Sequence, residues 1–229
     1  MVQPFIILFL LGGLQGYIGW RMVSSGLNDT DMYVKHTWLA THFLSALTLM
    51  GYTLWFAVSL LVPAEKRAVA PGLFKSTIAV IALLALQLAY GAFMAGLHAG
   101  KSAPTWPTVN GMWVPDTLHH SLVSNPINVQ FIHRCLAYVL IIVIGYWFVQ
   151  AGKTAKQNPG SILAQARWWP MVLVLAQVTL GIVTVLCAPL ITFAKFGIYE
   201  TLAETHQLVG MFLLMSLVVN LYIAKPGKA

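Results

Sequence analysis

Apolar residues fill several long stretches of this chain, and short polar segments rich in Pro, Gly and Lys separate them. A helix needs about 20 predominantly apolar residues to cross the hydrocarbon core of a bilayer. The stretches predict six transmembrane helices, over residues 4–22, 37–62, 73–97, 128–150, 168–192 and 202–224. The expected fold is therefore all-α, a polytopic helical bundle embedded in a lipid bilayer.

Composition and charge narrow the class of protein. With 59% hydrophobic and only 8% charged residues, the chain is too apolar for an ordinary soluble domain. A net charge of +7 is compatible with a nucleic-acid partner, but the basic residues are scattered among the loops. We interpret them as topology signals and expect no nucleic acid among the partners.

The basic residues also predict how the chain is oriented. Most lie near the loops after the second and fourth helices or at the C-terminal end: Lys66, Arg67, Lys75, Lys153, Lys156, Arg167, Lys225 and Lys228. By the positive-inside rule, both termini face the cytoplasm or the matrix. The opposite side receives every histidine and five of the six acidic residues: Asp29, Asp31, Asp116, Glu200 and Glu204.

Three histidines lie at one predicted depth. His42, His133 and His206 each stand about six residues inside an even-numbered helix, which places them roughly 9 Å below the outer surface. The residue one turn later is small in all three cases: Ala46, Ala137 and Gly210. Since positions i and i+4 share a helix face, a flat group has room beside each imidazole.

The odd-numbered helices carry a matching repeat. Each has a glutamine followed four residues later by a glycine: Gln15 and Gly19, Gln87 and Gly91, Gln177 and Gly181. The chain therefore resembles three copies of one helical hairpin. The glycines have a simpler explanation as well, since small residues let membrane helices pack closely.

Ionisable residues inside a membrane helix are costly and mark functional sites. Zinc or copper would need further ligands at this depth, and the helices supply only Glu204. Haem needs one or two axial imidazoles, and Arg134 beside His133 could bind its propionates. The alternatives are hydrogen-bonded histidines, a proton relay, and an arginine that reaches the interface.

The longest connection, residues 100–127, lies on the outer side. It is rich in proline and tryptophan, with Pro104, Trp106, Pro107, Trp113 and Pro115. Long loops of this kind are often functional. We expect either an ordered cap or an interfacial aromatic belt, and ordinary exposed histidines at His119 and His120.

Several stretches together resemble the heme A synthase family of membrane proteins, which act in cytochrome oxidase assembly. They are LQGYIGWRMVSSGL at 14–27, GAFMAGLHAG at 91–100, PTWP at 104–107, NVQFIHR at 128–134, LGIVT at 180–184 and ETHQ at 204–207. The matches span nearly the whole chain in the family's order.

The resemblance implies an oxidoreductase that converts the C8 methyl of haem O, its substrate, into the formyl group of haem A by successive hydroxylation. Members of the family have two four-helix bundles, each with a histidine pair. Residues 73–229 correspond to the second bundle, with haem B held by the iron ligands His133 and His206 and contacted by Arg134, Ala137 and Gly210. Residues 1–72 correspond to half of the first bundle, in which His42 is the catalytic residue and ligand of the substrate haem iron.

The chain also departs from the family pattern. The family's first helix pair has no counterpart in this sequence, Trp38 replaces a frequent arginine, and Ile132 replaces a frequent acidic residue. A truncated chain, a protein completed by another subunit and a shortened homologue without catalysis all remain open. The last suggests a non-catalytic b-type cytochrome or haem-handling subunit as the alternative function.

Partners and location follow from the same resemblance. Heme O synthase, an electron donor and a second copy of the chain are the candidate partners. No transit peptide is evident before the first helix, which favours the bacterial plasma membrane over the mitochondrial inner membrane.

Overall fold

The computed structural model describes residues 2–190 and 196–227. It contains six helices long and apolar enough to cross a membrane, which confirms the predicted all-α membrane fold. The long helices are α1 (Val2–Val23), α2 (His36–Leu61), α3 (Pro71–Gly96), α4 (Pro126–Gln157), α6 (Trp168–Cys187) and α7 (Ile198–Ile223). A short helix, α5 (Leu163–Ala166), continues into α6, and no strand occurs within the described residues.

Two helix ends differ from the prediction. Helix α4 continues to Gln157 rather than ending at residue 150, because helix-forming residues follow the last apolar turn. Helix α7 begins at Ile198 rather than at residue 202, and its first turn holds Glu200, whose carboxylate accepts a 2.8 Å hydrogen bond from the Gly197 N–H. The predicted end of the fifth helix at residue 192 lies outside the described residues, as does Lys228.

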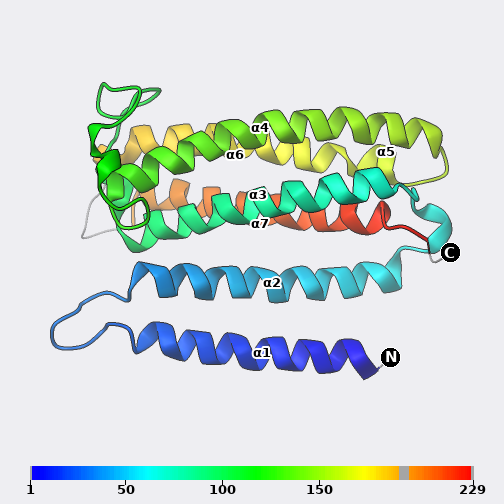
Figure 1. The fold of residues 1–229 in the computed structure, drawn as a ribbon, viewed down its shortest axis with the longest axis horizontal. Helices are drawn as coiled ribbons and strands as arrows, with labels where there is room; N and C mark the ends of the chain where they lie inside the picture. Colours follow the sequence, from blue (N-terminus) through cyan, green and yellow to red (C-terminus); the bar gives the residue numbers. More distant parts are fainter. Residues whose placement is uncertain (1, 191–195, 228–229) are drawn as a thin grey trace.

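Four helices form a bundle, and a hairpin packs beside it (Figure 1). Helix α3 packs against α4 and α7, and α6 packs against the same two helices, so α4 and α7 lie diagonally across the bundle. Helix α2 contacts α3 and α7, whereas α1 contacts α2 on the outside and contains no buried residue. Each bundle helix thus packs against two neighbours on its inner face, while α1 keeps most of its apolar surface for lipid.

The bundle core is apolar, and some of its buried polar groups form hydrogen bonds between helices. Trp147 of α4 is 1% exposed, and its indole N–H donates a 2.8 Å hydrogen bond to Oγ1 of the fully buried Thr77 on α3. Asn220 of α7 donates to the Ala166 carbonyl at 3.0 Å and so connects α7 to α5. Because polar atoms buried in a bundle need partners, these bonds specify which helices face each other.

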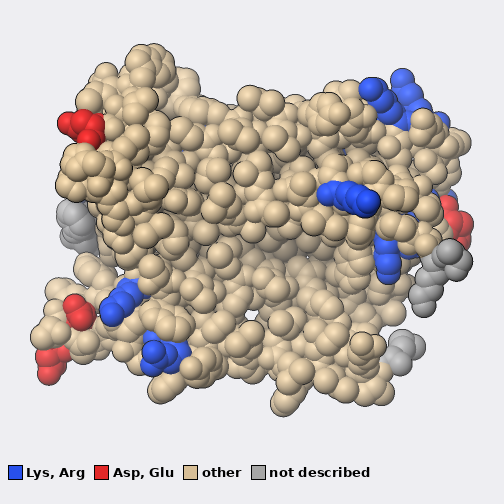
Figure 2. Space-filling model, viewed as in Figure 1, with Lys and Arg blue, Asp and Glu red and all other residues tan. Residues whose placement is uncertain are grey.

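The two ends of the molecule differ in charge (Figure 2). We call one the loop end: it holds the connections 24–35 and 97–125, and all seven histidines lie in its loops or in the adjoining helix halves. We call the other the basic end, which holds seven described Lys and Arg residues: Lys66, Arg67, Lys75, Lys153, Lys156, Arg167 and Lys225. The asymmetry matches the distribution that the sequence predicts.

Replacing Thr77 tests the polar contact in the core. Thr77→Val keeps the shape of the side chain but leaves the buried Trp147 N–H without an acceptor, so the free energy of unfolding should fall by about 1–2 kcal/mol. Unfolding of the purified protein in detergent micelles measures the change. Thr77→Ser retains the hydroxyl and is the control, and equal stability of the two variants would contradict this role.

Candidate functional site

Each helical hairpin brings a glutamine of its first helix against a histidine of its second. The amide nitrogen of Gln87 on α3 lies 3.2 Å from Nε2 of His133 on α4. The amide nitrogen of Gln177 on α6 lies 3.3 Å from Nε2 of His206 on α7 in the same way. The repeat seen in the sequence is therefore a repeated side-chain contact at one level of the fold.

The glycine of each repeat makes room for the imidazole. A Cβ atom built on Gly91 would lie 3.3 Å from Cε1 of His133, and one on Gly181 would lie 3.0 Å from Cε1 of His206. Both distances are tight for a Cβ contact, so the histidine ring occupies the space that a side chain would take. Close helix packing alone does not describe these glycines, because each one faces an imidazole.

His133 and His206 approach each other inside the bundle. They come from the diagonal helices α4 and α7, and their ring centroids are 6.3 Å apart with an interplanar angle of 68°. Metal–imidazole bonds are about 2.0–2.1 Å long, so two such bonds on opposite sides of one ion, with a ring radius added at each end, separate the centroids by about 6 Å. The spacing therefore suits two axial ligands of a single iron.

Several polar atoms around this pair lack protein partners. Nδ1 of both histidines and Oε1 of both Gln87 and Gln177 are buried without a hydrogen bond. A buried polar atom left unpaired costs about 1–3 kcal/mol. Such a cluster fits a site that is completed by a ligand, and the two imidazoles beside it are the residue types that ligate a bis-histidine haem.

The same end of α4 contains a second unsatisfied group. Gln130 is 1% exposed, and neither its amide nitrogen nor its amide oxygen has a hydrogen-bond partner. It precedes His133 by three residues and Arg134 by four, so it lies about one helical turn closer to the loop end. The sequence marks this stretch as polar within an apolar helix, but only the structure shows that the amide is fully buried.

His42 lies on α2, in the hairpin α1–α2, apart from the other two histidines. Its ring faces α1, where the amide nitrogen of Gln15 lies 3.3 Å from Nδ1 and a Cβ on Gly19 would lie 2.9 Å from Cε1. Ser45 donates hydrogen bonds to Oε1 of Gln15 and, at 2.9 Å, to the His42 carbonyl. Ser45 is not predicted from the sequence, since nothing in the repeat distinguishes it from other small residues.

The small residues after the histidines do not all leave open space. A Cβ on Gly210 would lie 3.0 Å from the amide nitrogen of Gln177 and 3.5 Å from Cδ2 of Leu88. Gly210 is therefore covered by the end of a flexible side chain, which can turn aside, and by a leucine methyl. Ala46 and Ala137 are half-buried. The predicted contact of Ala137 and Gly210 with a flat ligand stays a prediction.

Arg134 holds the outer loop to the bundle. Its guanidinium donates hydrogen bonds to the carbonyls of Ala103 at 2.7 Å, Thr105 at 2.8 Å and Thr108 at 3.1 Å. Trp106 adds a 3.1 Å hydrogen bond from its indole N–H to the hydroxyl of Tyr138. These contacts favour the ordered cap over a simple aromatic belt, and they leave two of the five guanidinium donors for another acceptor.

The remaining histidines lie at the loop end. His36 is near the Ser124 hydroxyl at 3.4 Å, His98 stacks on Tyr33, and His119 contacts His120 with ring centroids 4.0 Å apart. None of the residues that the structure describes form a group of three or more His, Cys, Asp or Glu that could hold a metal. His119 and His120 are exposed neighbours in the loop, whereas His133 and His206 meet between two helices of the bundle.

The fold and the site define a class of protein, an integral membrane helical bundle with paired histidines inside the helices. The chain belongs to the cytochrome oxidase assembly protein family, whose sequence model matches residues 1–218. This confirms the family resemblance that the sequence motifs predict.

The chain is similar to curated proteins named heme A synthase. It is 38% identical to that of Parvibaculum lavamentivorans over 192 residues, covering 81% of this chain and 53% of the relative. The corresponding protein of Rhodospirillum centenum is 37% identical over 96% of this chain and 58% of its own length, and that of Paracoccus denitrificans is 33% identical over 94% and 56%. The chain thus spans about half the length of the curated relatives it matches.

The loop contacts of Arg134 predict the effect of replacing it. Arg134→Gln removes most of three charge-assisted hydrogen bonds, so residues 100–127 should open more often and be cleaved at least about tenfold faster by chymotrypsin in detergent solution. Arg21→Gln is the control, because Arg21 lies at the same end but contacts the rings of Trp20 and Trp38. Equal cleavage rates for wild type and Arg134→Gln would show that the loop is held by other contacts.

Proposed function

We propose that this chain is a membrane haemoprotein of the heme A synthase type, which oxidises the C8 methyl of haem O to the formyl of haem A for cytochrome oxidase assembly. The observation that carries the proposal is the 6.3 Å approach of the His133 and His206 rings from diagonal helices. The names of the relatives give the reaction class. The chain spans about half the length of these relatives, so the activity of the whole protein is part of the proposal.

In this proposal the chain has two parts. Residues 73–229 form the bundle that binds haem B, with His133 and His206 as iron ligands and Ala137 and Gly210 beside the macrocycle. The bound haem supplies electron transfer, and the protein sets its ligation, its burial and its access to water. Residues 1–72 form half of the substrate bundle, in which His42 binds the iron of haem O as the catalytic residue.

Gln87 and Gln177 orient the two imidazoles before iron is bound. Each amide lies within 3.3 Å of the Nε2 atom that would coordinate the iron, and each is the end of a flexible side chain. A ligand at Nε2 would take the place of this amide contact, and the flexible glutamine side chain can turn aside to allow it. Arg134 keeps two donors for a propionate while its other three hold the loop.

The second candidate function is a non-catalytic b-type cytochrome or haem-handling subunit. The observation that favours it is that a pair of histidines is present in residues 73–229, whereas residues 1–72 contain no such pair around His42. His133 has a second histidine beside it, whereas the ring of His42 faces Gln15 and Gly19 on α1, a helix with no buried residue. A protein that binds only haem B would need only the first arrangement.

The membrane setting belongs to the same proposal. The basic end faces the cytoplasm of a bacterium, with the plasma membrane as the location and the mitochondrial matrix as the alternative side. Heme O synthase and an electron donor act with the chain, and a second copy is a candidate partner.

The ligand assignment predicts a spectrum. The purified protein should show a low-spin b-type haem, and His133→Ala or His206→Ala should abolish it, because each variant removes one axial imidazole. Absorption spectra and haem content per protein measure the loss. His120→Ala, an exposed loop histidine, is the control and should retain the full spectrum. Wild-type spectra in both ligand variants would remove the assignment.

Extracted pigments distinguish the two candidate functions. Cells that supply haem O and express this chain should accumulate haem A under the synthase proposal, and His42→Ala should reduce haem A to the background level while sparing the bound haem B. Chromatography of extracted haems measures both. Haem B alone, in wild type and variant, would support the cytochrome and contradict the synthase.

A further inference from the structure

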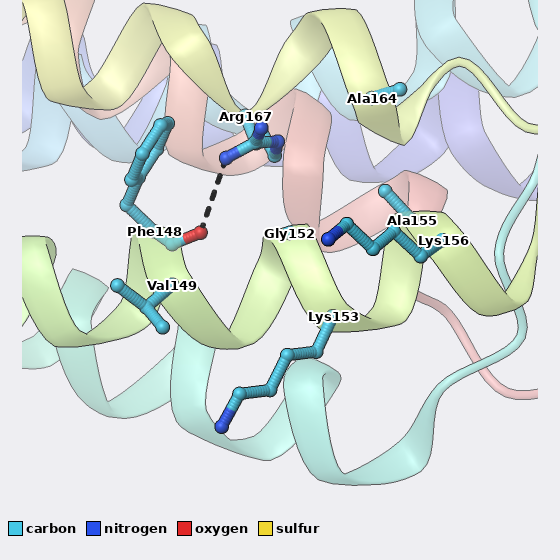
Figure 3. Close-up of a pocket in the computed structure, with 8 residues that line it drawn as sticks. All are labelled: Phe148, Val149, Gly152, Lys153, Ala155, Lys156, Ala164 and Arg167. Atoms are coloured by element: carbon cyan, nitrogen blue, oxygen red, sulfur yellow. Dashed lines mark hydrogen bonds between the residues drawn. The ribbon is translucent and has the colours of Figure 1, made fainter.

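A groove at the basic end lies far from the histidines. It is a cavity of about 550 Å³ between the last turns of α4, the short helix α5 and the start of α6 (Figure 3). The site proposed above uses none of its lining residues.

Arg167 forms the floor of this groove without an acidic partner. Its guanidinium carbon lies 4.3 Å from the ring centroid of Phe148 and 5.0 Å from that of Trp168. One weak hydrogen bond, 3.5 Å long, reaches the Phe148 carbonyl, and its Nε is buried without a partner. Ring faces hold the cation in place, but they do not neutralise its charge.

Helix α4 is shaped to admit this arginine. A Cβ atom on Gly152 would lie 3.1 Å from a terminal nitrogen of Arg167 and 3.4 Å from its Cζ atom. In Figure 3 the ammonium of Lys156 extends beside Gly152, on the side of α4 where Arg167 lies, and Lys153 extends on the other side of the helix. Both lysines are exposed, and no acidic residue is among the residues that line the groove.

The groove lies at the level of the membrane where lipid headgroups are expected. Helix α4 has 32 residues and is therefore about 48 Å long, longer than the hydrocarbon core of about 30 Å. No Asp, Glu, Lys or Arg occurs from Cys135 to Gly152, and Lys153 is the first cation after that apolar run. The lysines and Arg167 thus stand where α4 leaves the apolar layer.

We propose that this groove binds the phosphodiester headgroup of an anionic phospholipid. Arg167 and Lys156 contact the phosphate oxygens, Lys153 adds positive charge at the rim, and the apolar wall of Phe148, Val149 and Ala164 contacts the upper part of an acyl chain. Basic pockets between transmembrane helices are typical sites of this kind. A free phosphate shares the headgroup chemistry, but it would leave the apolar wall without a function.

Native mass spectrometry of the delipidated full chain in detergent tests the proposal, with phosphatidylglycerol and phosphatidylcholine as probes. Phosphatidylglycerol should be retained in preference. Lys153→Gln combined with Lys156→Gln should weaken its binding by about five- to twentyfold, since each basic residue near a lipid surface contributes about a fivefold change. Gly152→Ala should also weaken it by crowding the Arg167 guanidinium. Lys75→Gln, an exposed lysine of the same end outside the groove, is the matched control and should bind as wild type does.

Each other outcome overturns the proposal. Equal retention of the two lipids, or unchanged binding in the double lysine variant, would show that the groove does not select an anionic headgroup. Inorganic phosphate that binds as tightly as phosphatidylglycerol, with the same loss in the variants, would assign a free phosphate instead of a lipid. The lysines are exposed, so unfolding curves of the double variant should match the wild type and exclude misfolding as the cause. None of these results depends on haem.

Discussion

An imidazole inside a membrane helix needs a polar partner, because the surrounding lipid offers none. In this protein the partner comes from the preceding helix of the same hairpin, where a glutamine amide lies 3.2 to 3.3 Å from a ring nitrogen. A glycine one turn along that helix lets the Cε1 edge of the ring approach the backbone. This contact fixes the rotation and relative height of the two helices, so the hairpin is the unit from which the fold is built.

The environment of each hairpin then decides what its histidine can do. The hairpins α3–α4 and α6–α7 pack face to face, which buries their histidines and brings the two rings together. The hairpin α1–α2 contacts the bundle mainly through α2, and α1 has no buried residue among those that the structure describes. The same local contact therefore produces a paired ligand site in one place and a single half-buried imidazole in the other.

The sequence predicts the helices, the depth of the histidines and the hairpin repeat, because apolar runs and helical spacing are local properties. It does not predict which side chains meet across the loops. Arg134 binds carbonyls about 30 residues away in the chain, at Ala103, Thr105 and Thr108, and nothing in the spacing of the loop encodes those contacts. The groove at Arg167 is missed for a related reason: its shape depends on α4 continuing past its last apolar turn.

The two arginines near the ends of α4 show how the surroundings of a cation determine its role. At the loop end, three carbonyl oxygens surround Arg134, so most of its hydrogen-bonding capacity is used inside the protein and its main effect is to order the loop. At the basic end, Arg167 lies between aromatic rings with its Nε unsatisfied and one long hydrogen bond to a carbonyl. A cation held by carbonyls organises the protein around it, whereas one held by ring faces keeps its charge available to an external anion.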